Sequence, residues 1–316
     1  MNSRRCGPTL TKGSILKQSR TQSTKSKKPT TRPSMAASVL ASGGIRNLIV
    51  VSDIHAGCRM GLCPDPGIQL DGGGWYGTSP FQDYMWGRWL EFWADWVPHV
   101  TKGEPWALIV NGDTIDGVHH GATTQVSHNL NDQANIARKI LEPVVAQAAA
   151  YYHIRGTEAH VGKSGAEEER LARELGAIPD SNGEHARWEL WHEMQGPDGK
   201  PRLVHFTHHI GTTGSSSYEA TAIGKEMVEM FVETGRWGNQ SADVLIRSHR
   251  HRYSQVQMYG VRGLQICAVT PGWQGKTPFG YKIAGRMSPP QFGGMLVRVG
   301  DEGLYTRAKV WSLGRE

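Results

Sequence analysis

The stretch that most constrains the fold is Leu-Ile-Val-Val-Ser-Asp-Ile-His at residues 48–55. Its four leading apolar residues, three of them β-branched, predict a buried strand that is too short to be a helix. Asp53 and His55 follow where that strand should end, and residues two apart in an extended chain project from the same face. A carboxylate and an imidazole that emerge together are a natural first pair of metal ligands. The alternative interpretation is an ordinary polar turn after a strand.

The length and composition are typical of a globular protein. The chain has 316 residues, of which 38% are hydrophobic and 20% are charged, enough for one large core or two small ones. It contains no apolar run long enough for a membrane-spanning helix, so we expect no membrane partner. The four cysteines, Cys6, Cys58, Cys63 and Cys267, are too few for a disulfide framework in a chain of this size. They predict free thiols in a reducing, cytoplasmic compartment.

The basic residues are concentrated at the N-terminus. Residues 1–34 contain nine Lys or Arg and no Asp or Glu, which leaves 26 basic against 29 acidic residues in the remainder. The tail is also rich in Ser and Thr, a composition that cannot bury enough apolar surface to fold. We therefore predict a disordered basic tail over residues 1–40 and a single domain over residues 45–316. The tail could contact nucleic acid, whereas the slightly acidic body does not indicate a nucleic-acid-binding domain.

The order of expected elements predicts an α/β fold. Strands are expected at residues 106–110, 151–154, 187–194, 202–207, 243–246, 253–259, 264–269, 294–299 and 305–311. Helices are expected at residues 81–97, ended by Pro98, at 132–150 with a break near Pro143, at 164–175 after a capping box, and at 218–234. The alternation of strand and helix in the first half predicts parallel pairing, and Gly196-Pro197-Asp198-Gly199 predicts a hairpin. Together, these expected strands and helices predict an α/β fold with two packed β-sheets flanked by helices.

Polar residues rich in Asp and His follow five of these strands. In α/β sheets the ligand site lies at the carboxyl ends of the strands, so we expect these side chains to converge. The candidates are Asp53, His55, Asp113, a residue within 157–160, His208 or His209, His249 and His251. Carboxylate with imidazole suits a pair of divalent first-row metal ions, which in two-metal sites lie about 3.5–4 Å apart. Asp113, in the middle of the order, is the expected bridge because a carboxylate can give one oxygen to each ion.

This ordered set resembles the calcineurin-like metallophosphoesterase superfamily. The family pattern is D-x-H, G-D-x-x-D/H, G-N-H-D/E, a lone His and G-H-x-H. The corresponding segments here are Asp53-Ile54-His55, Gly112-Asp113-Thr114-Ile115-Asp116, Gly156-Thr157-Glu158-Ala159-His160, His208, and Ser248-His249-Arg250-His251. The resemblance covers residues 46 to about 275 and implies the two-sheet fold of that family. It also implies a dinuclear phosphoesterase in which a metal-bridging hydroxide attacks phosphorus.

The resemblance implies specific roles for these residues. Asp53, His55, Asp113 and His251 would bind one metal ion, and Asp113, His208 and His249 the second, with a further ligand from the third motif. The third motif departs from the family because Thr157 and Glu158 stand where Asn and His are usual. Glu158 is taken as the replacement ligand, with Thr157 and His160 as alternatives, and His160 is favoured as the general acid because of its pKa range. The Gly-Thr-x-Ala-His form is similar to variants in phage and prophage genomes.

Several other residues have two interpretations. Arg155 and His120 could bind the substrate phosphate, or Arg155 could pair with an acid and His120 could be a solvated loop residue. Asp116 is expected to orient a ligand rather than bind metal. His208 is preferred over His209, which should project to the other face of its strand. Trp273 could stack on a leaving group, although core packing is the more frequent fate of a Trp.

The favoured function is a metal-dependent phosphoric ester hydrolase that acts on phosphate mono- or diesters. Mn²⁺ is the expected metal, with Fe, Zn and Ni as alternatives. A metal-dependent DNA nuclease of the same superfamily is one alternative, supported by the basic tail. A non-catalytic binding or scaffold protein on the same fold is the other, supported by the altered third motif. The sequence leaves the physiological substrate and the oligomeric state open.

Overall fold

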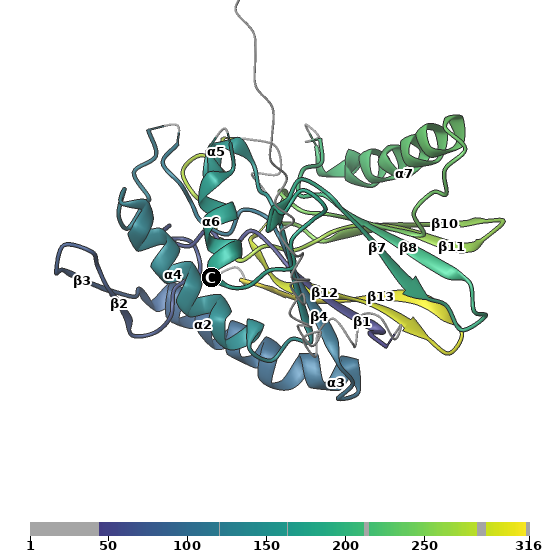
Figure 1. Ribbon diagram of the computed structural model, residues 1–316. Helices are drawn as coiled ribbons and strands as arrows, with labels where there is room; N and C mark the ends of the chain where they lie inside the picture. The colour runs from purple at the N-terminus through teal and green to yellow at the C-terminus, as the bar shows by residue number, and fades with distance from the viewer. Residues whose placement is uncertain (1–43, 120, 163, 212–214, 283–288, 314–316) are drawn as a thin grey trace, which may run out of the picture. The chain divides into compact units, whose positions relative to one another are not determined.

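The computed structural model describes residues 44–119, 121–162, 164–211, 215–282 and 289–313 (Figure 1). The predicted disordered tail at residues 1–40 lies outside these ranges, and so does Cys6. The element labels below are those of Figure 1.

Two β-sheets form the centre of the described domain. The first has six strands in the order β13-β12-β1-β4-β5-β6. Their bounds are β1 Asn47–Val51, β4 Trp106–Asn111, β5 Ala150–Ile154, β6 Ala186–Arg187, β12 Gln291–Gly300 and β13 Gly303–Ser312. β1, β4, β5 and β6 run parallel, as the alternation of strand and helix predicted, and β12 joins β1 antiparallel.

The second sheet has five strands in the order β10-β11-β9-β8-β7. Their bounds are β7 Leu190–Gln195, β8 Pro201–Phe206, β9 Val244–Arg247, β10 Ser254–Gly260 and β11 Gly263–Val269. β7 and β8 form the predicted hairpin, and β8, β9 and β11 run parallel. A separate two-stranded ribbon, β2 Gly67–Gln69 with β3 Trp75–Gly77, lies in the segment predicted to be a long loop.

Helices cover the outer face of each sheet. The helical segments are α2 Pro80–Glu91, a π-helical turn Phe92–Trp96, α3 Val97–Thr101, α4 Leu130–Val145, α5 Glu158–Val161, α6 Ala166–Glu174, a 3₁₀ turn Ser216–Tyr218 and α7 Glu219–Arg236. Figure 1 shows α7 beside the five-stranded sheet and α2, α4 and α6 beside the other one. The predicted α/β class with two packed sheets and helices outside is confirmed.

Strand β1 shows how the residue pattern produces these layers. Its residues are fully buried, and successive side chains leave opposite faces. Leu48 and Val50 pack between the two sheets, whereas Ile49 and Val51 pack against the helices. A strand buried on both faces reads as a continuous apolar run, which is why residues 48–51 lack polar alternation. The Trp stripe of the first helix joins the same helical layer, where Trp89 and Trp93 are buried.

Three helix boundaries differ from the predictions. Pro98 does not end the first helix, because it lies in the first turn of α3, where a missing N–H costs nothing. Pro143 lies inside α4 without dividing it. The capping box expected at Ser164 is absent, since α6 begins after Gly165 and has no side-chain cap. A true capping box is found at α2 instead, where the Ser79 hydroxyl accepts from the backbone of Gln82.

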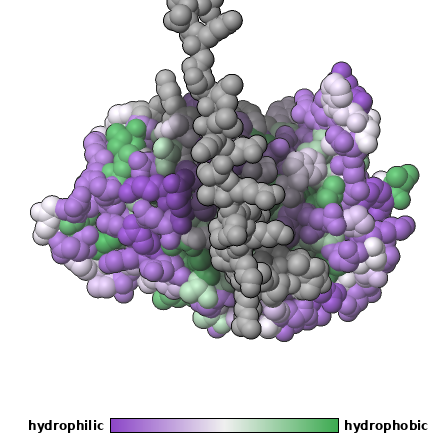
Figure 2. Space-filling view, viewed as in Figure 1, coloured by the Kyte–Doolittle hydropathy of each residue, from purple (hydrophilic) through white to green (hydrophobic). Residues whose placement is uncertain are grey.

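The described surface is mostly hydrophilic in the view of Figure 2, with scattered apolar residues, among them the tip of the β10–β11 hairpin. Tyr259 and Val261 are exposed at that tip. No helix within the described ranges is long and apolar enough to cross a membrane. The three cysteines of the described residues, Cys58, Cys63 and Cys267, are free and buried.

Candidate metal centre

The carboxyl ends of five strands meet at one edge of the two sheets. The loops that follow β1 and β4 run side by side there, because the backbone N–H groups of Asp53 and His55 donate to the carbonyls of Gly112 and Asp113. The loops after β5, β8 and β9 supply Thr157, His208 and His249 to the same edge. The Asp- and His-rich segments therefore converge, as the sequence led us to expect.

A first group of ligand atoms comes from Asp53, His55 and His251. The Oδ1 atom of Asp53 lies 3.1 Å from Nε2 of His251. The Nε2 atoms of His55 and His251 lie 3.2 Å apart. One carboxylate oxygen and two imidazole nitrogens thus lie close together. This set of atoms is suited to bind a divalent transition-metal ion.

A second group comes from Asp113, His208 and His249. The Oδ2 atom of Asp113 lies 2.9 Å from Nε2 of His208 and 3.9 Å from Nδ1 of His249. The Nδ1 atom of His208 lies 2.6 Å from the carbonyl of Asn111, which fixes Nδ1 as the donor and leaves Nε2 for the site. His208 is buried and belongs to this group, whereas His209 is exposed and belongs to none of the groups.

The two groups are adjacent, and Asp53 forms the contact between them. Its Oδ1 atom lies 3.8 Å from Nε2 of His208 as well as 3.1 Å from His251. Asp113, the expected bridge, contributes one atom to the second group. Its other oxygen, Oδ1, already accepts hydrogen bonds from the Thr157 backbone N–H at 2.7 Å and hydroxyl at 3.2 Å.

The backbone at these residues is left-handed. Positive φ angles of 53° at Asp53, 48° at His55, 52° at Asp113, 69° at His249 and 53° at His251 account for five of the six positive values among the described non-glycine residues. A left-handed conformation costs a residue with a Cβ roughly 1–2 kcal/mol, so it persists only where the surrounding structure imposes it. The prediction that Asp53 and His55 project together from an extended strand is therefore wrong. They lie in a turn, in which the backbone orients each side chain separately.

Two glycines allow the loops to approach this closely. A Cβ atom on Gly112 would lie 2.5 Å from Nδ1 of His208. A Cβ atom on Gly156 would lie 2.1 Å from Oδ1 of Asp113. Any other residue at either position would displace a candidate ligand, which gives a physical reason for glycine in both motifs.

The electrostatics of the site suit bound cations. Burial opposes the charge on His208, but Asp113 and Asp53 outweigh it and raise the pKa of His208 to about 10. Burial likewise opposes the charge on Asp53, and His251 with His208 lower its pKa to about 2. The Oδ1 atom of Asp53 and the Nε2 atom of His208 are buried and form no hydrogen bond with the described residues. The two atoms lie 3.8 Å from each other, and Nε2 of His208 lies 2.9 Å from Oδ2 of Asp113. Orphaned ligand atoms in a cluster with buried carboxylates fit metal ions, which would replace the proton on His208.

Asp116 lies behind the first group and positions its ligands. Its Oδ1 atom is 3.3 Å from Nδ1 of His55. Gln125 donates to Asp116 at 2.8 Å and Gln274 at 3.3 Å, two contacts that the sequence analysis missed. The sequence shows Gln274 as a polar residue next to Trp273, but it does not show that Gln274 contacts Asp116, which is 158 positions away. Trp273 itself is fully buried in the helical-layer core, where it does not reach a leaving group.

His160 lies between the two groups. Its Nδ1 atom is 2.7 Å from the Asp116 carbonyl, so Nδ1 carries the proton and Nε2 is the free atom, 3.9 Å from Oδ2 of Asp113. Burial lowers the pKa of His160 to about 4, against the opposing effect of Asp113. The imidazole is therefore neutral at pH 7, with a lone pair on Nε2. His55, Asp116 and His160 also form a third group of possible ligands.

Two of the predicted residues, Glu158 and Arg155, do not join the site. Glu158 is exposed and belongs to none of the three groups of possible ligands. Arg155 is buried, and it pairs with Glu184 at 3.0 Å while its other N–H groups donate to the carbonyls of Ala186 and Ser164. The geometry thus agrees with the alternative that Arg155 pairs with an acid, rather than with a role in binding phosphate. His120 lies outside the described residues.

A cavity of about 630 Å³ opens over the candidate ligands. Its floor includes His55, Asp113, His160, His249 and His251, and its rim includes the basic residues Arg250, Arg252, Lys276 and Lys282. Arg252 forms an ion pair with Glu219 of α7. A rim of cations over a cluster of metal ligands suits an anionic ligand.

Comparisons with known proteins give no family assignment. No family model and no curated protein matches the sequence. Similar solved structures include vacuolar protein sorting 29 from Cryptosporidium parvum, with 10% identity, coverage of 85% of this chain and 100% of that one, and a TM-score of 0.32. They also include the sulfate thiohydrolase of Thermus thermophilus, with 12% identity, coverage of 85% and 57%, and a TM-score of 0.34. The phosphopantetheinyl hydrolase of Mycobacterium tuberculosis has 12% identity, coverage of 78% and 94%, and a TM-score of 0.32. Similarity this weak transfers no residue role or activity to the present chain.

Proposed function

We propose that this protein is a dinuclear metal-dependent phosphoesterase of the calcineurin-like metallophosphoesterase type. The observation that supports this most strongly is the left-handed backbone at five candidate ligands, which brings them into two adjacent groups. Strain of this kind at several charged, buried residues is typical of a functional site rather than of a solvated turn.

The residues divide into roles according to their positions. Asp53, His55 and His251 would hold one ion, and Asp113, His208 and His249 would hold the other, with Mn²⁺ as the proposed metal. When bound, such a pair supplies a nucleophilic water and neutralises charge on the phosphoryl group. Asp116 keeps the His55 ring in orientation, and the carbonyl of Asn111 does the same for His208. The basic rim would draw the anionic substrate into the cavity.

His160 is proposed to handle the proton of the leaving group. The Asp116 carbonyl fixes its tautomer, so Nε2 is the atom that can take up a proton and release it within the cavity. A pKa of about 4 makes the neutral form dominant, so His160 would first accept the proton that the attacking water loses and would then donate it to the leaving oxygen. Thr157 lies beside Asp113 and holds that carboxylate through two hydrogen bonds.

The test is hydrolysis by metal-stripped protein before and after addition of Mn²⁺. Bis-p-nitrophenyl phosphate and p-nitrophenyl phosphate serve as the diester and monoester substrates. We expect metal-dependent cleavage of at least one of them, with the preference distinguishing a phosphodiesterase from a phosphatase. Absence of turnover on both, together with no metal retained by the protein, would reject the proposal in favour of a non-catalytic protein.

A further inference from the structure

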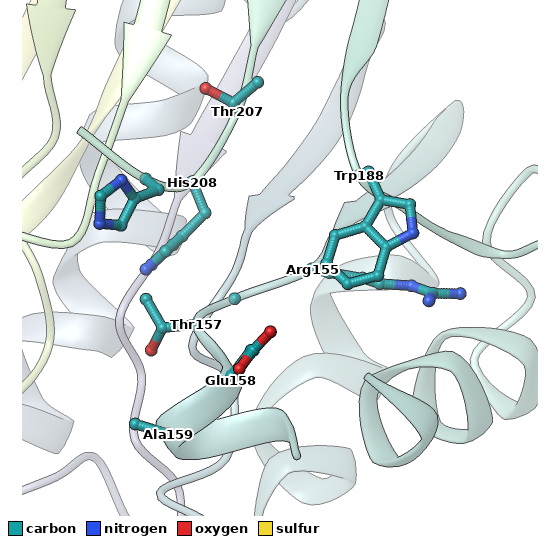
Figure 3. A pocket seen from close by; sticks show the side chains of 9 residues that line it. Arg155, Thr157, Glu158, Ala159, Trp188, Thr207 and His208 are labelled. Carbon is teal, nitrogen blue, oxygen red and sulfur yellow. The ribbon is translucent and has the colours of Figure 1, made fainter. Parts of the chain in front are cut away.

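A second cavity, of about 430 Å³, lies beside the metal centre. Residues that line it include Thr157, Glu158, Trp188, Thr207, His208 and His209 (Figure 3). It shares Thr157 with the cavity over the candidate ligands, and its His208 wall has its Nε2 atom 2.9 Å from Asp113. A molecule whose phosphate lies at the metal groups could therefore extend a second moiety into this neighbouring cavity.

Trp188 supplies a fixed aromatic surface in this cavity. The side chain is 55% exposed although it is a large apolar residue. The guanidinium of Arg155 lies 4.8 Å from the centre of the Trp188 ring, and Arg155 is itself held by Glu184 and two backbone carbonyls. One face of the indole thus lies against the buried Arg155 guanidinium, which pairs with the partly exposed Glu184. Figure 3 shows Trp188 and Arg155 on one side of the cavity, with His208 and Thr157 on the other.

Glu158 supplies a hydrogen-bond acceptor between these two sides, as Figure 3 shows. Its carboxylate is exposed, and among the described residues it forms no ion pair. The Thr207 hydroxyl adds a group that can donate or accept. A flat aromatic surface next to a carboxylate binds a planar ring that has N–H groups along its edge.

This combination distinguishes a nucleobase from an organic cation. Trp188 already has the cation of Arg155 against its ring, so a second cation on the indole would meet like charge. A nucleobase brings a neutral π-face to the indole, and guanine offers two neighbouring N–H donors that match both oxygens of a carboxylate. A base within a duplex has its faces covered by its neighbours and could not stack here.

We propose that this cavity binds the nucleobase of an unpaired nucleotide, with guanine preferred, while the nucleotide's phosphate lies at the metal centre. The proposal rests on the proposed phosphoesterase function for the place of the phosphate. It assigns Trp188 and Glu158 to substrate specificity and limits nucleic-acid substrates to nucleotides and single strands.

The experiment compares ligands that differ only in the base. Guanosine 5′-monophosphate, uridine 5′-monophosphate and ribose 5-phosphate are titrated calorimetrically into the full-length protein with Mn²⁺, and phosphate release is monitored to confirm that each ligand stays intact. Stacking on an aromatic side chain should make guanosine monophosphate bind roughly 5- to 100-fold more tightly than ribose 5-phosphate. Trp188→Ala should remove that difference and leave the affinity for ribose 5-phosphate unchanged.

Two further variants separate stacking from edge recognition. Glu158→Gln should reduce the preference for guanosine over uridine monophosphate by about 10-fold, because an amide cannot accept both N–H groups. Trp237→Ala is the matched control, since Trp237 is 75% exposed at the end of α7 and lines neither cavity, and it should change no affinity.

The outcomes distinguish this proposal from the proposed function. Equal binding of guanosine monophosphate and ribose 5-phosphate, in an enzyme that hydrolyses the test diester, would reject the base site and keep the phosphoesterase. Equal loss of both ligands in Trp188→Ala would also reject the base site, because it would indicate a structural role for the indole. Base-dependent binding that Trp188→Ala abolishes, without turnover of any ester, would keep the base site and reject the phosphoesterase.

Discussion

Strands β1 and β4 differ sharply from the loops that directly follow them. The strands have regular extended backbone and residues such as Ile49 and Ile109 that are fully buried among other apolar groups. Only two residues after each strand ends, the backbone is left-handed at Asp53 and Asp113, and both carboxylates are buried beside other charges. Each buried Val, Leu or Ile contributes about 1.5–3 kcal/mol, whereas each left-handed residue with a Cβ costs about 1–2 kcal/mol.

The difference teaches that the two regions are under opposite constraints. The strand interiors stabilise the fold and have no polar group to offer a ligand. The loops hold residues with strained backbone and buried charged side chains, which the strands before them keep in place. Substitutions in the loops should therefore act mainly on activity, whereas substitutions in the strands should act mainly on stability.

The largest expected effect is that of Asp113→Asn. The substitution removes the charge of a proposed ligand while the side chain can still accept the hydrogen bonds from Thr157. We expect phosphoesterase activity to fall by roughly a thousandfold or more, because the metal centre supplies several kcal/mol of transition-state stabilisation. Activity close to wild type in steady-state assays would contradict the assignment of the centre.

A smaller effect is expected from His160→Gln, and it should depend on the leaving group. Loss of general acid catalysis costs about 10²–10⁴-fold when the leaving oxygen needs a proton. A p-nitrophenolate leaves without one, so its ester should be affected much less than an alkyl phosphate ester. Steady-state rates on both esters give the comparison. An equal loss on the two would show that His160 serves the site through another residue or as a ligand.

Ile109→Ala tests the strand interior. Ile109 is fully buried between the sheets, and its truncation should lower the free energy of unfolding by about 2–5 kcal/mol through lost burial and a residual cavity. Specific activity per folded molecule should remain within about twofold of wild type because the loops are unchanged. Denaturant unfolding measures the free energy of unfolding, and a separate assay at low temperature measures the specific activity of the folded protein. A large fall in the activity of the folded protein would contradict the prediction that substitutions in the strands act on stability rather than on activity.

The smallest effect is expected from Lys102→Gly. Lys102 is the sixth described non-glycine residue with positive φ, 57°, and it caps the end of α3 away from the metal centre. Glycine is free of the Cβ penalty there, so the variant should gain about 1 kcal/mol in the free energy of unfolding. Activity should not change. A loss of stability would mean that left-handed backbone is not strained in this protein, which would weaken the inference drawn from the five ligands.

The sequence predicted the fold better than it predicted the geometry of the site. Apolar runs such as residues 106–110 mark buried strands because burial on both faces leaves no alternation, and the glycine-proline turn at residues 196–199 marks the hairpin. Pro98 was misleading because the first turn of a helical segment tolerates a proline, and Pro98 lies in the first turn of α3. The β2–β3 ribbon was missed because its three-residue strands have too few residues to show a period.

The ligand types and their order were readable, but their directions were not. Asp and His adopt left-handed φ angles more often than most residues, but nothing in the sequence marks which of them do so. The turn that orients Asp53 and His55 was therefore not predicted. The partners of Arg155 and Asp116 were equally hidden, since Glu184 is 29 positions from Arg155 and Gln274 is 158 from Asp116. Trp188 attracted no notice because nothing in its neighbourhood distinguishes an exposed Trp from a core one.

The strained loops also bear on how the protein would acquire its metal. The positions of Asp53 and Asp113 depend on left-handed backbone directly after β1 and β4, so these side chains come together once the strands have folded. The open cavity above it gives an ion a route from solvent into the finished protein. Metal loading would then follow folding, and the ion found in a purified sample would reflect the supply in the expression culture as much as the preference of the ligands. Growth medium would thus become an experimental variable, and samples from manganese-rich and zinc-rich cultures should differ in metal content while sharing one fold.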